Sequence, residues 1–246
     1  MHYVGVGKLS DETKQNSPVA RKPPTGVNIQ FVSSWQIILP TVYRYENAEW
    51  INRFFEFGEL QLSTFSKFAT YEDEVRGDPN EGRGVAFGFS DKQTTVIAAG
   101  QGSDAFVLCC SSLLNRGLQT KFERDSAFAI ENTQSFAYEV SRQLQGFRQG
   151  LEGHCIYRSS TTIEREFSVD MEKYKLPEGG VDMQMIFDTA SALGGPERLL
   201  LKLKEYETQR EYRLLWHVDH VEDDYIKIRC PLAVKHCRQL DESDYE

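Results

Sequence analysis

The chain has 246 residues, of which 37 are acidic and 28 are lysine or arginine, so its formal net charge is −9. At this length a chain buries enough apolar surface to fold without disulfides or a structural metal. No uninterrupted apolar run approaches about 18 residues, which excludes a transmembrane helix. The acidic total argues against non-specific binding of duplex nucleic acid, because that binding needs a broad basic surface.

The N-terminus and the cysteines together predict a cytoplasmic protein. The first eight residues lack the charged, apolar and small-residue succession of a signal peptide. The five cysteines are odd in number and none forms a CxxC pair, and reduced thiols of this kind are typical of the cytosol. We therefore expect no membrane partner.

Composition divides the chain into three parts. Residues 1–33 are polar and interrupted by prolines and glycine, which predicts a flexible N-terminal arm. The last eight residues, 239–246, carry four acids and no base, which predicts a solvated acidic tail. Between these ends, residues 34–238 show no hinge-like segment, so we expect a single globular domain there.

In chain order, the first clear elements are a strand region and a helix. Residues 35–45 are rich in β-branched and aromatic side chains, which predicts one or two strands broken at Pro40. Apolar side chains then recur at helical spacing over 48–57. Asn47 can cap this helix at its start and Gly58 can end it.

The rest of the chain alternates short strands with a few helices. An acidic, glycine-rich loop is expected at 71–84, and the apolar run at 105–110 predicts a strand buried on both faces. Further strands are expected at 60–65, 126–130, 153–158, 163–169, 211–218 and 224–229, and further helices at 133–144 and 196–203. This pattern predicts an α+β fold with a mixed or antiparallel sheet core.

The segment with most functional information is the predicted strand at 211–218 with the residues just before it. Alternate side chains of a strand share a face, so Gln209, Glu211 and Arg213 project to one side. A carboxylate and an amide on one face can form a site. The competing interpretation is an edge strand with a Glu–Arg ladder.

A second candidate lies at the end of the first strand, where Arg44 stands between Tyr43 and Tyr45. The planar guanidinium suits phosphate oxyanions, and tyrosine rings offer stacking faces. A surface arginine lying over tyrosine rings fits the same three residues.

The third candidate is a group of small hydroxyl residues, Ser63, Thr64 and Ser66. Hydroxyls at a strand end can hold a carboxylate in place or bind a ligand. A turn uses the same residue types, so this segment alone leaves both interpretations open.

The three segments occur in the order arginine, serine–threonine–x–serine, glutamine–x–glutamate, which is similar to the order found in the ADP-ribosyltransferase superfamily. The resemblance implies that Arg44 contacts NAD, that the hydroxyl strand shapes the nicotinamide pocket, and that Glu211 drives the chemistry while Gln209 faces the acceptor. The candidate catalytic residues are thus Glu211 and Gln209, and the candidate cofactor-binding residues are Arg44, Tyr43, Tyr45, Ser63, Thr64 and Ser66.

A second resemblance covers more of the chain, roughly residues 40 to 230. It rests on the runs 43–45, 54–64, 76–82 and 106–111 and on the Glu-x-Arg at 211–213. These runs resemble a widespread bacterial domain of unknown function that is often found near phage-defence genes. The resemblance implies a fold and a setting among toxins or defence proteins, with an antitoxin or a defence protein as partner.

Chemistry links these residues to NAD. Cleavage of the nicotinamide–ribose bond passes through an oxocarbenium-like cation, which a fixed carboxylate stabilises, and the pyrophosphate needs a cation. A Rossmann dehydrogenase is not expected, because its glycine-rich fingerprint is missing. We therefore interpret the chain as an NAD-dependent ADP-ribosyltransferase-like effector. It would transfer ADP-ribose to a macromolecular acceptor, protein or nucleic acid, with NAD as substrate and no metal.

Two other functions stay open. One is a non-enzymatic nucleotide-sensing or protein-interaction module on the same fold. The other is a metal-dependent nuclease built on His217, Asp219, His220 and the acids at 222–224. The acidic loop matches a calcium loop only around 78–80, so we expect a solvated turn there.

Overall fold

The computed structural model describes residues 39–69, 83–90, 93–100, 105–160, 163–166, 171–182, 185 and 196–245. The chain divides into two compact units, Met1–Ile38 and Leu39–Glu246, and every described residue belongs to the second. The predicted arm at 1–33 and residues 71–82 of the predicted acidic loop therefore lie outside the described residues. Within the described part, no helix has the length and apolar character needed to cross a membrane.

The second unit combines helices with antiparallel sheet, which confirms the predicted α+β class. Its strands are β1 Val42–Glu46, β2 Glu59–Thr64, β3 Arg83–Ser90, β4 Gln93–Gly100, β5 Ala105–Ser111, β6 Ser126–Ile130, β7 Phe147–His154, β8 Ile156–Arg158, β9 Ile163–Glu166, β10 Leu201–Leu203, β11 Glu211–Val218, β12 Tyr225–Arg229 and β13 Cys237–Gln239. Its α-helices are α1 Ala48–Phe57, α2 Phe65–Ala69, α3 Arg116–Lys121 and α4 Thr133–Ser141. Short 3₁₀ helices cover Met171–Tyr174, Pro196–Leu200, Lys204–Gln209, Ala233–His236 and Glu242–Asp244.

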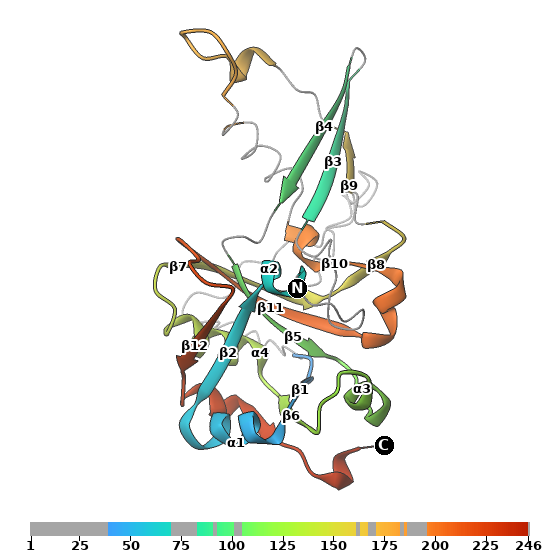
Figure 1. The fold of residues 1–246 in the computed structure, drawn as a ribbon, viewed down its shortest axis with the longest axis vertical. Helices are drawn as coiled ribbons and strands as arrows, with labels where there is room; N and C mark the ends of the chain where they lie inside the picture. Colours follow the sequence, from blue (N-terminus) through green and yellow to red (C-terminus); the bar gives the residue numbers. More distant parts are fainter. Residues whose placement is uncertain are drawn as a thin grey trace, which may run out of the picture. The chain divides into compact units, whose positions relative to one another are not determined.

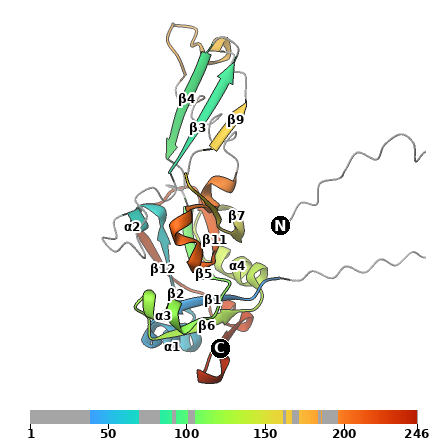
Figure 2. The same ribbon diagram turned by 90° about the vertical axis from the view of Figure 1, so that its right-hand side faces the viewer.

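The main sheet has eight strands and is organised around β5 and β11 (Figure 1). β11 pairs antiparallel with β5 along its length and with β7 on its other side. The remaining order runs β12, β2, β5, β1, β6, β13. Two smaller sheets accompany it: β4, β3 and β9 form one (Figure 2), and the parallel pair β8 and β10 forms the other (Figure 1).

One edge of β5 is shared by two strands that diverge from each other. β2 pairs with its first half, where Ser63 lies opposite Val107, and β1 pairs with its end, where Tyr43 lies opposite Ser111. Between these two points, β11 is the one described strand that pairs with β5. The divergence opens a gap in the sheet, and the candidate site lies in this gap.

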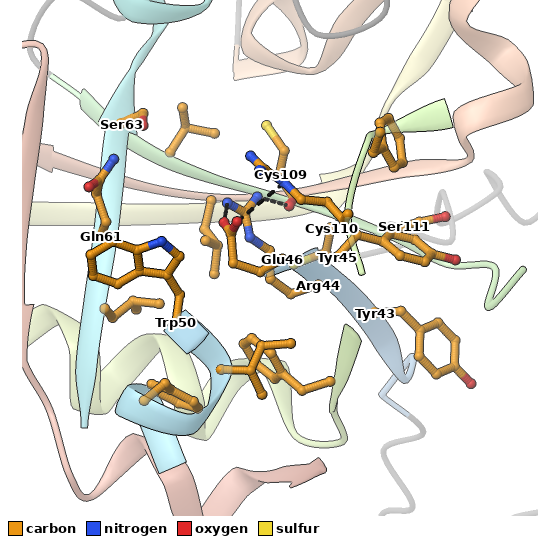
Figure 3. A pocket seen from close by; sticks show the side chains of 18 of the residues that line it. Tyr43, Arg44, Tyr45, Glu46, Trp50, Gln61, Ser63, Cys109, Cys110 and Ser111 are labelled. Atoms are coloured by element: carbon orange, nitrogen blue, oxygen red, sulfur yellow. Dashed lines mark hydrogen bonds and ion pairs between the residues drawn. The ribbon is translucent and has the colours of Figure 1, made fainter. Parts of the chain in front are cut away.

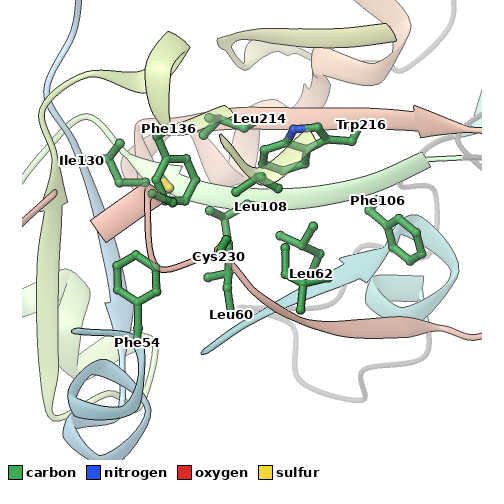
Figure 4. Packing of buried hydrophobic residues seen from close by; sticks show 14 of the residues in the cluster. Phe54, Leu60, Leu62, Phe106, Leu108, Ile130, Phe136, Leu214, Trp216 and Cys230 are labelled. Carbon is green, nitrogen blue, oxygen red and sulfur yellow. The ribbon is translucent and has the colours of Figure 1, made fainter. Parts of the chain in front are cut away.

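The largest apolar cluster packs α1 and α4 against one face of the sheet (Figure 4). The alternate residues Tyr212, Leu214 and Trp216 of β11 face this cluster, as the strand pattern predicts. Leu215 faces the opposite side, where it packs with Phe65 and other residues near α2. Because both faces of β11 are covered, its polar residues Glu211 and Arg213 are buried as well.

Helix α1 has the bounds that the sequence predicts, but its first turn is capped differently. Gly58 ends the helix in the left-handed region at φ 73°, and its N–H donates to the Phe54 carbonyl at 2.8 Å. The Asn47 side chain makes no capping bond. Instead, the Ala48 N–H donates to Asp125 Oδ1 at 2.6 Å. A residue far away in sequence thus supplies the acceptor that the local pattern assigned to Asn47.

One sequence prediction needs correction. The helix predicted at 196–203 is a 3₁₀ helix that ends at Leu200, and residues 201–203 form β10 beside β8. The predicted acidic tail, 239–246, follows β13, which pairs with β6, and residues 239 and 241–243 are exposed. Arg238 holds this segment by donating to Asp244 Oδ1 at 2.7 Å, and the Arg116 guanidinium lies 3.6 Å from the ring centre of Tyr245.

We predict that Gly58→Ala destabilises the protein far more than Gly179→Ala. Both glycines have positive φ, 73° and 90°, which costs an alanine about 1 kcal/mol. A Cβ at Gly58 would also lie 2.4 Å from the backbone nitrogen of Pro231, whereas one at Gly179 meets open space. Overpacking adds about 1–3 kcal/mol at Gly58 alone. Urea unfolding of both variants checks the difference, and equal losses would contradict the prediction.

Candidate functional site

A cavity of about 610 Å³ lies where β1 and β2 diverge from β5. Its walls come from β1, β2, β5, β12, α1 and the segment that leads into β11. Six of the eight predicted site residues line it, namely Tyr43, Arg44, Tyr45, Ser63, Gln209 and Glu211. Three segments that are far apart in the sequence thus meet at one cavity of the size that small-molecule ligands occupy.

Arg44 occupies the gap between the two diverging strands (Figure 3). Its Nη1 donates to the carbonyl oxygen of Cys109 at 2.8 Å, at a point on β5 that lies between its pairings with β2 and β1. Its Nη2 donates to Glu46 Oε2 at 3.0 Å. The guanidinium therefore substitutes for a missing strand partner, and it is fixed by that bond at the wall of the cavity.

Glu211 is the centre of a buried ionic network. Its Oε1 accepts from Arg213 Nε at 2.6 Å, and its Oε2 accepts from Lys202 Nζ. The Lys202 ammonium also donates to Gln209 Oε1 at 3.0 Å, and Arg213 donates to the carbonyl of Leu199 at 2.7 Å. The four residues are at most 5% exposed. β11 lies between β5 and β7, so this ion pair is internal and the edge-strand interpretation of the segment is wrong.

The network keeps Glu211 ionised. Burial by itself raises the pKa of the carboxyl, but attraction to Arg213 and Lys202 outweighs burial and holds the pKa well below its usual range. The carboxylate therefore stays ionised near neutral pH, and it is poorly suited to exchanging a proton there.

Lys202 is a site residue that the sequence analysis missed. It lies on β10, beside Tyr157 of β8. The Tyr157 hydroxyl accepts from the backbone N–H of Glu211 at 2.7 Å, so the small parallel sheet also supports the end of β11. The signal was present as the alternation Leu201-Lys202-Leu203, which is typical of a short strand.

Gln209 reaches the network from a different backbone element than predicted. It ends the 3₁₀ helix Lys204–Gln209, and Arg210 then adopts a left-handed conformation at φ 47° before β11 begins. The Gln209 carbonyl accepts from the Ser111 hydroxyl at 2.8 Å, while its amide oxygen faces Lys202. Positive φ at a non-glycine residue is costly and is concentrated at functional sites.

The three hydroxyl residues Ser63, Thr64 and Ser66 do not lie at one place in the fold. Ser63 lines the cavity. Thr64 and Ser66 are engaged elsewhere: their hydroxyls lie 2.7 Å apart, and they donate to the carbonyl and the carboxylate of Asp224, each at 3.0 Å. These two residues therefore tie the end of β2 to the loop before β12, and the structure does not bring them to the cavity.

Ser63 and Glu211 lie at opposite ends of the site. Ser63 pairs with Val107 on one edge of β5, and Glu211 pairs with Ser111 on the other. At ~3.3 Å per residue and ~4.8 Å between strands, their Cα atoms are about 16 Å apart. A ligand that touches both residues must be elongated, and the residue opposite Glu211 on β5 is Ser111.

The two tyrosines beside Arg44 differ in their roles. Tyr45 is buried, and its hydroxyl donates to Leu113 O at 2.7 Å and accepts from Asn115 N at 2.8 Å. Burial raises the pKa of Tyr45 to about 12. Its ring is fixed against Phe122, whereas Tyr43 remains partly exposed at the cavity. Tyr43 is thus the less constrained of the two, although its ring points away from the Arg44 guanidinium in Figure 3.

The charge of the cavity wall is opposite to that of the whole chain. Three carboxylates face five cations, which are Arg44, Arg124, Lys202, Lys227 and Arg229. The chain as a whole carries −9. A local excess of positive charge in a concave site attracts anions such as phosphates.

The residues of the nuclease hypothesis are arranged differently. Asp219 pairs with Arg148, and Asp224 accepts bonds from the β2 corner. Across the described ranges, no group of three or more histidine, cysteine or acidic side chains comes close enough to hold a metal ion.

Comparison with known proteins identifies no relative of this chain. No family model, no curated protein and no solved structure matches the chain. The two resemblances noted in the sequence therefore remain hypotheses, and the site must be interpreted from its own geometry.

We predict that Glu211→Gln destabilises the protein by about 3 kcal/mol, because it removes a negative charge that pairs with two buried cations, Lys202 and Arg213. Adding Lys202→Met should restore part of the loss, since it removes one of those cations. Urea unfolding measures both, and Glu207→Gln, on the exposed side of the neighbouring 3₁₀ helix, is the matched control. A double variant less stable than Glu211→Gln would contradict the network.

The contribution of Glu211 to stability should decrease as the pH becomes acidic. Its pKa is lower in the folded than in the unfolded chain, so the stabilisation is present above the unfolded value of about 4.3 and is lost as pH falls below it. We expect the difference in unfolding free energy between wild type and Glu211→Gln to be constant from about pH 8 to pH 5.5 and to shrink in more acidic buffer. A difference that shrinks above pH 6 would be inconsistent with this assignment.

Proposed function

We propose that the protein binds NAD in the cavity between β1 and β2 and acts as an ADP-ribosyltransferase-like enzyme. The observation that carries this proposal is the meeting of Arg44, Ser63 and Glu211 at one cavity. These residues were selected from the sequence by their chemistry, and their meeting depends on the divergence of β1 and β2. The cationic wall and the distance between Ser63 and Glu211 both favour an elongated, phosphate-bearing ligand.

Each part of the site has a place in the proposed reaction. The glycosidic bond between the ribose C1′ and the nicotinamide nitrogen breaks, and its electron pair leaves with nicotinamide. A nucleophilic atom of the acceptor then bonds to C1′ and loses its proton to solvent. Glu211, held ionised by Arg213 and Lys202, stabilises the positive charge that develops on the ribose. Arg44 faces the pyrophosphate.

The setting of this activity is part of the same proposal. The resemblance to a domain found near phage-defence genes supports a cytoplasmic toxin or defence protein with a macromolecular acceptor. An antitoxin or a defence protein is the partner that such a setting implies.

A nucleotide-binding module without catalysis is the second candidate. It is favoured by one observation: both carboxylate oxygens of Glu211 accept bonds from buried cations, Arg213 and Lys202. A carboxylate whose charge is compensated in this way stabilises a developing cation less than an unpaired one does. Such a protein would bind NAD at the same cavity without releasing nicotinamide.

Labelled NAD separates these two candidates. Incubated with cell extract, the wild-type protein should transfer label to an acceptor and release nicotinamide, and Glu211→Gln should lower the rate about 10²–10³-fold. Glu207→Gln should retain the wild-type rate. Because Glu211→Gln is expected to be less stable, the Glu211→Gln/Lys202→Met variant is assayed beside it, with folding checked by circular dichroism. Full activity in both folded variants would remove the assigned role of Glu211, and binding without nicotinamide release would favour the binding module.

A further inference from the structure

An exposed tryptophan stands at the mouth of the cavity. Trp50 lies on α1 and lines the cavity together with Gln61 of β2 and Lys227 of β12. It remains 41% exposed, although Phe54, one turn further along α1, is only 2% exposed. A large, partly exposed aromatic side chain beside a cavity is the arrangement found in sites that stack a planar ligand.

Cations surround the indole of Trp50. Lys227 Nζ lies 5.0 Å from its ring centre, and the Arg53 guanidinium carbon lies 5.3 Å from it. Arg53 is also paired with Glu59 at 2.6 Å. Lys227 stands opposite Gln61 in the pairing of β12 with β2, so a flexible lysine and a neutral amide stand side by side near the ring.

These contacts have a simpler interpretation, in which the cations only cover an exposed ring. Such contacts are weak in water, and a lysine side chain moves at little cost. Stacking of a nucleobase on an aromatic ring is the stronger interaction. An arriving base can therefore displace Lys227 from the ring, and the ammonium is then available to a phosphate on the same ligand.

We propose that Trp50 stacks the adenine of the ligand at the mouth of the cavity, with Lys227 binding its phosphate. This proposal rests on the proposed NAD site, and it assigns the orientation of NAD in the cavity. Figure 3 shows Trp50, Gln61 and Ser63 on one side of the Arg44 guanidinium and Ser111 on the other. Glu211 pairs with Ser111, so the nicotinamide end lies there, the pyrophosphate lies near Arg44, and the adenine lies on Trp50. Ser63 then lies at the adenine end, so this assignment departs from the nicotinamide-pocket role that the family resemblance implies for it.

Fluorescence titration with AMP and with nicotinamide mononucleotide tests the assignment. The chain has three tryptophans. Of these, Trp216 is buried in the core and Trp50 is exposed. AMP should quench the wild-type emission. Trp50→Ala should weaken AMP binding about tenfold to hundredfold, as measured by calorimetry. Trp50→Phe should retain most of the affinity, because it keeps a stacking face.

Phe57→Ala is the matched control, since Phe57 is an equally exposed aromatic residue of the same helix, at 39%. It should bind AMP as wild type does, and Trp50→Ala should bind nicotinamide mononucleotide as wild type does. AMP binding that is undetectable in wild type, unchanged in Trp50→Ala, or equally weakened in Phe57→Ala would overturn the proposal. If the wild-type protein binds AMP through Trp50 but releases no nicotinamide from NAD, only the catalytic function is overturned.

Discussion

The arrangement of the site depends on one backbone carbonyl, that of Cys109. A carbonyl inside a sheet must find a donor, and the divergence of β1 from β2 removes the strand that would supply one. Arg44 supplies it from the side, at 2.8 Å. The same bond keeps the two strands apart and holds a cation at the wall of the opening between them. The opening and the position of Arg44 at its wall therefore both follow from a single hydrogen-bonding requirement.

At the far end of the cavity, the buried charges of Lys202, Glu211 and Arg213 serve a different purpose. A buried ionic network is weak support for stability, because apolar residues of similar volume often replace one at no loss. What such a network fixes well is geometry, since Glu211 is held on both oxygens. Its partners come from β10 and from β11 itself. A carboxylate with so little freedom loses little entropy when it meets a charged ligand or transition state.

Local patterns in the sequence were sufficient for α1, for the two faces of β11 and for the Glu211–Arg213 face, because these depend on periodicity. They were insufficient wherever distant segments meet. Asp125 caps α1 in place of Asn47, and Lys202 joins Glu211 through a strand that was predicted as a helix. The hydroxyl motif shows the limit most clearly. The motif predicts one shared role for its residues, and the structure assigns Thr64 and Ser66 to a corner with Asp224, 158 to 160 residues away in the chain.

The short C-terminal strand has a further consequence for the sheet. β13 covers the outer side of β6, whose residues Phe128 and Ile130 belong to the apolar core. Without this cover, β6 would present a hydrophobic strand with unpaired amides and carbonyls, which is a template for pairing with other chains. β13 is three residues long and carries Arg238 at its centre, and short, charged edge strands resist such pairing. Residues 237–239 thus cover an edge of the main sheet that would otherwise be open to pairing with other chains.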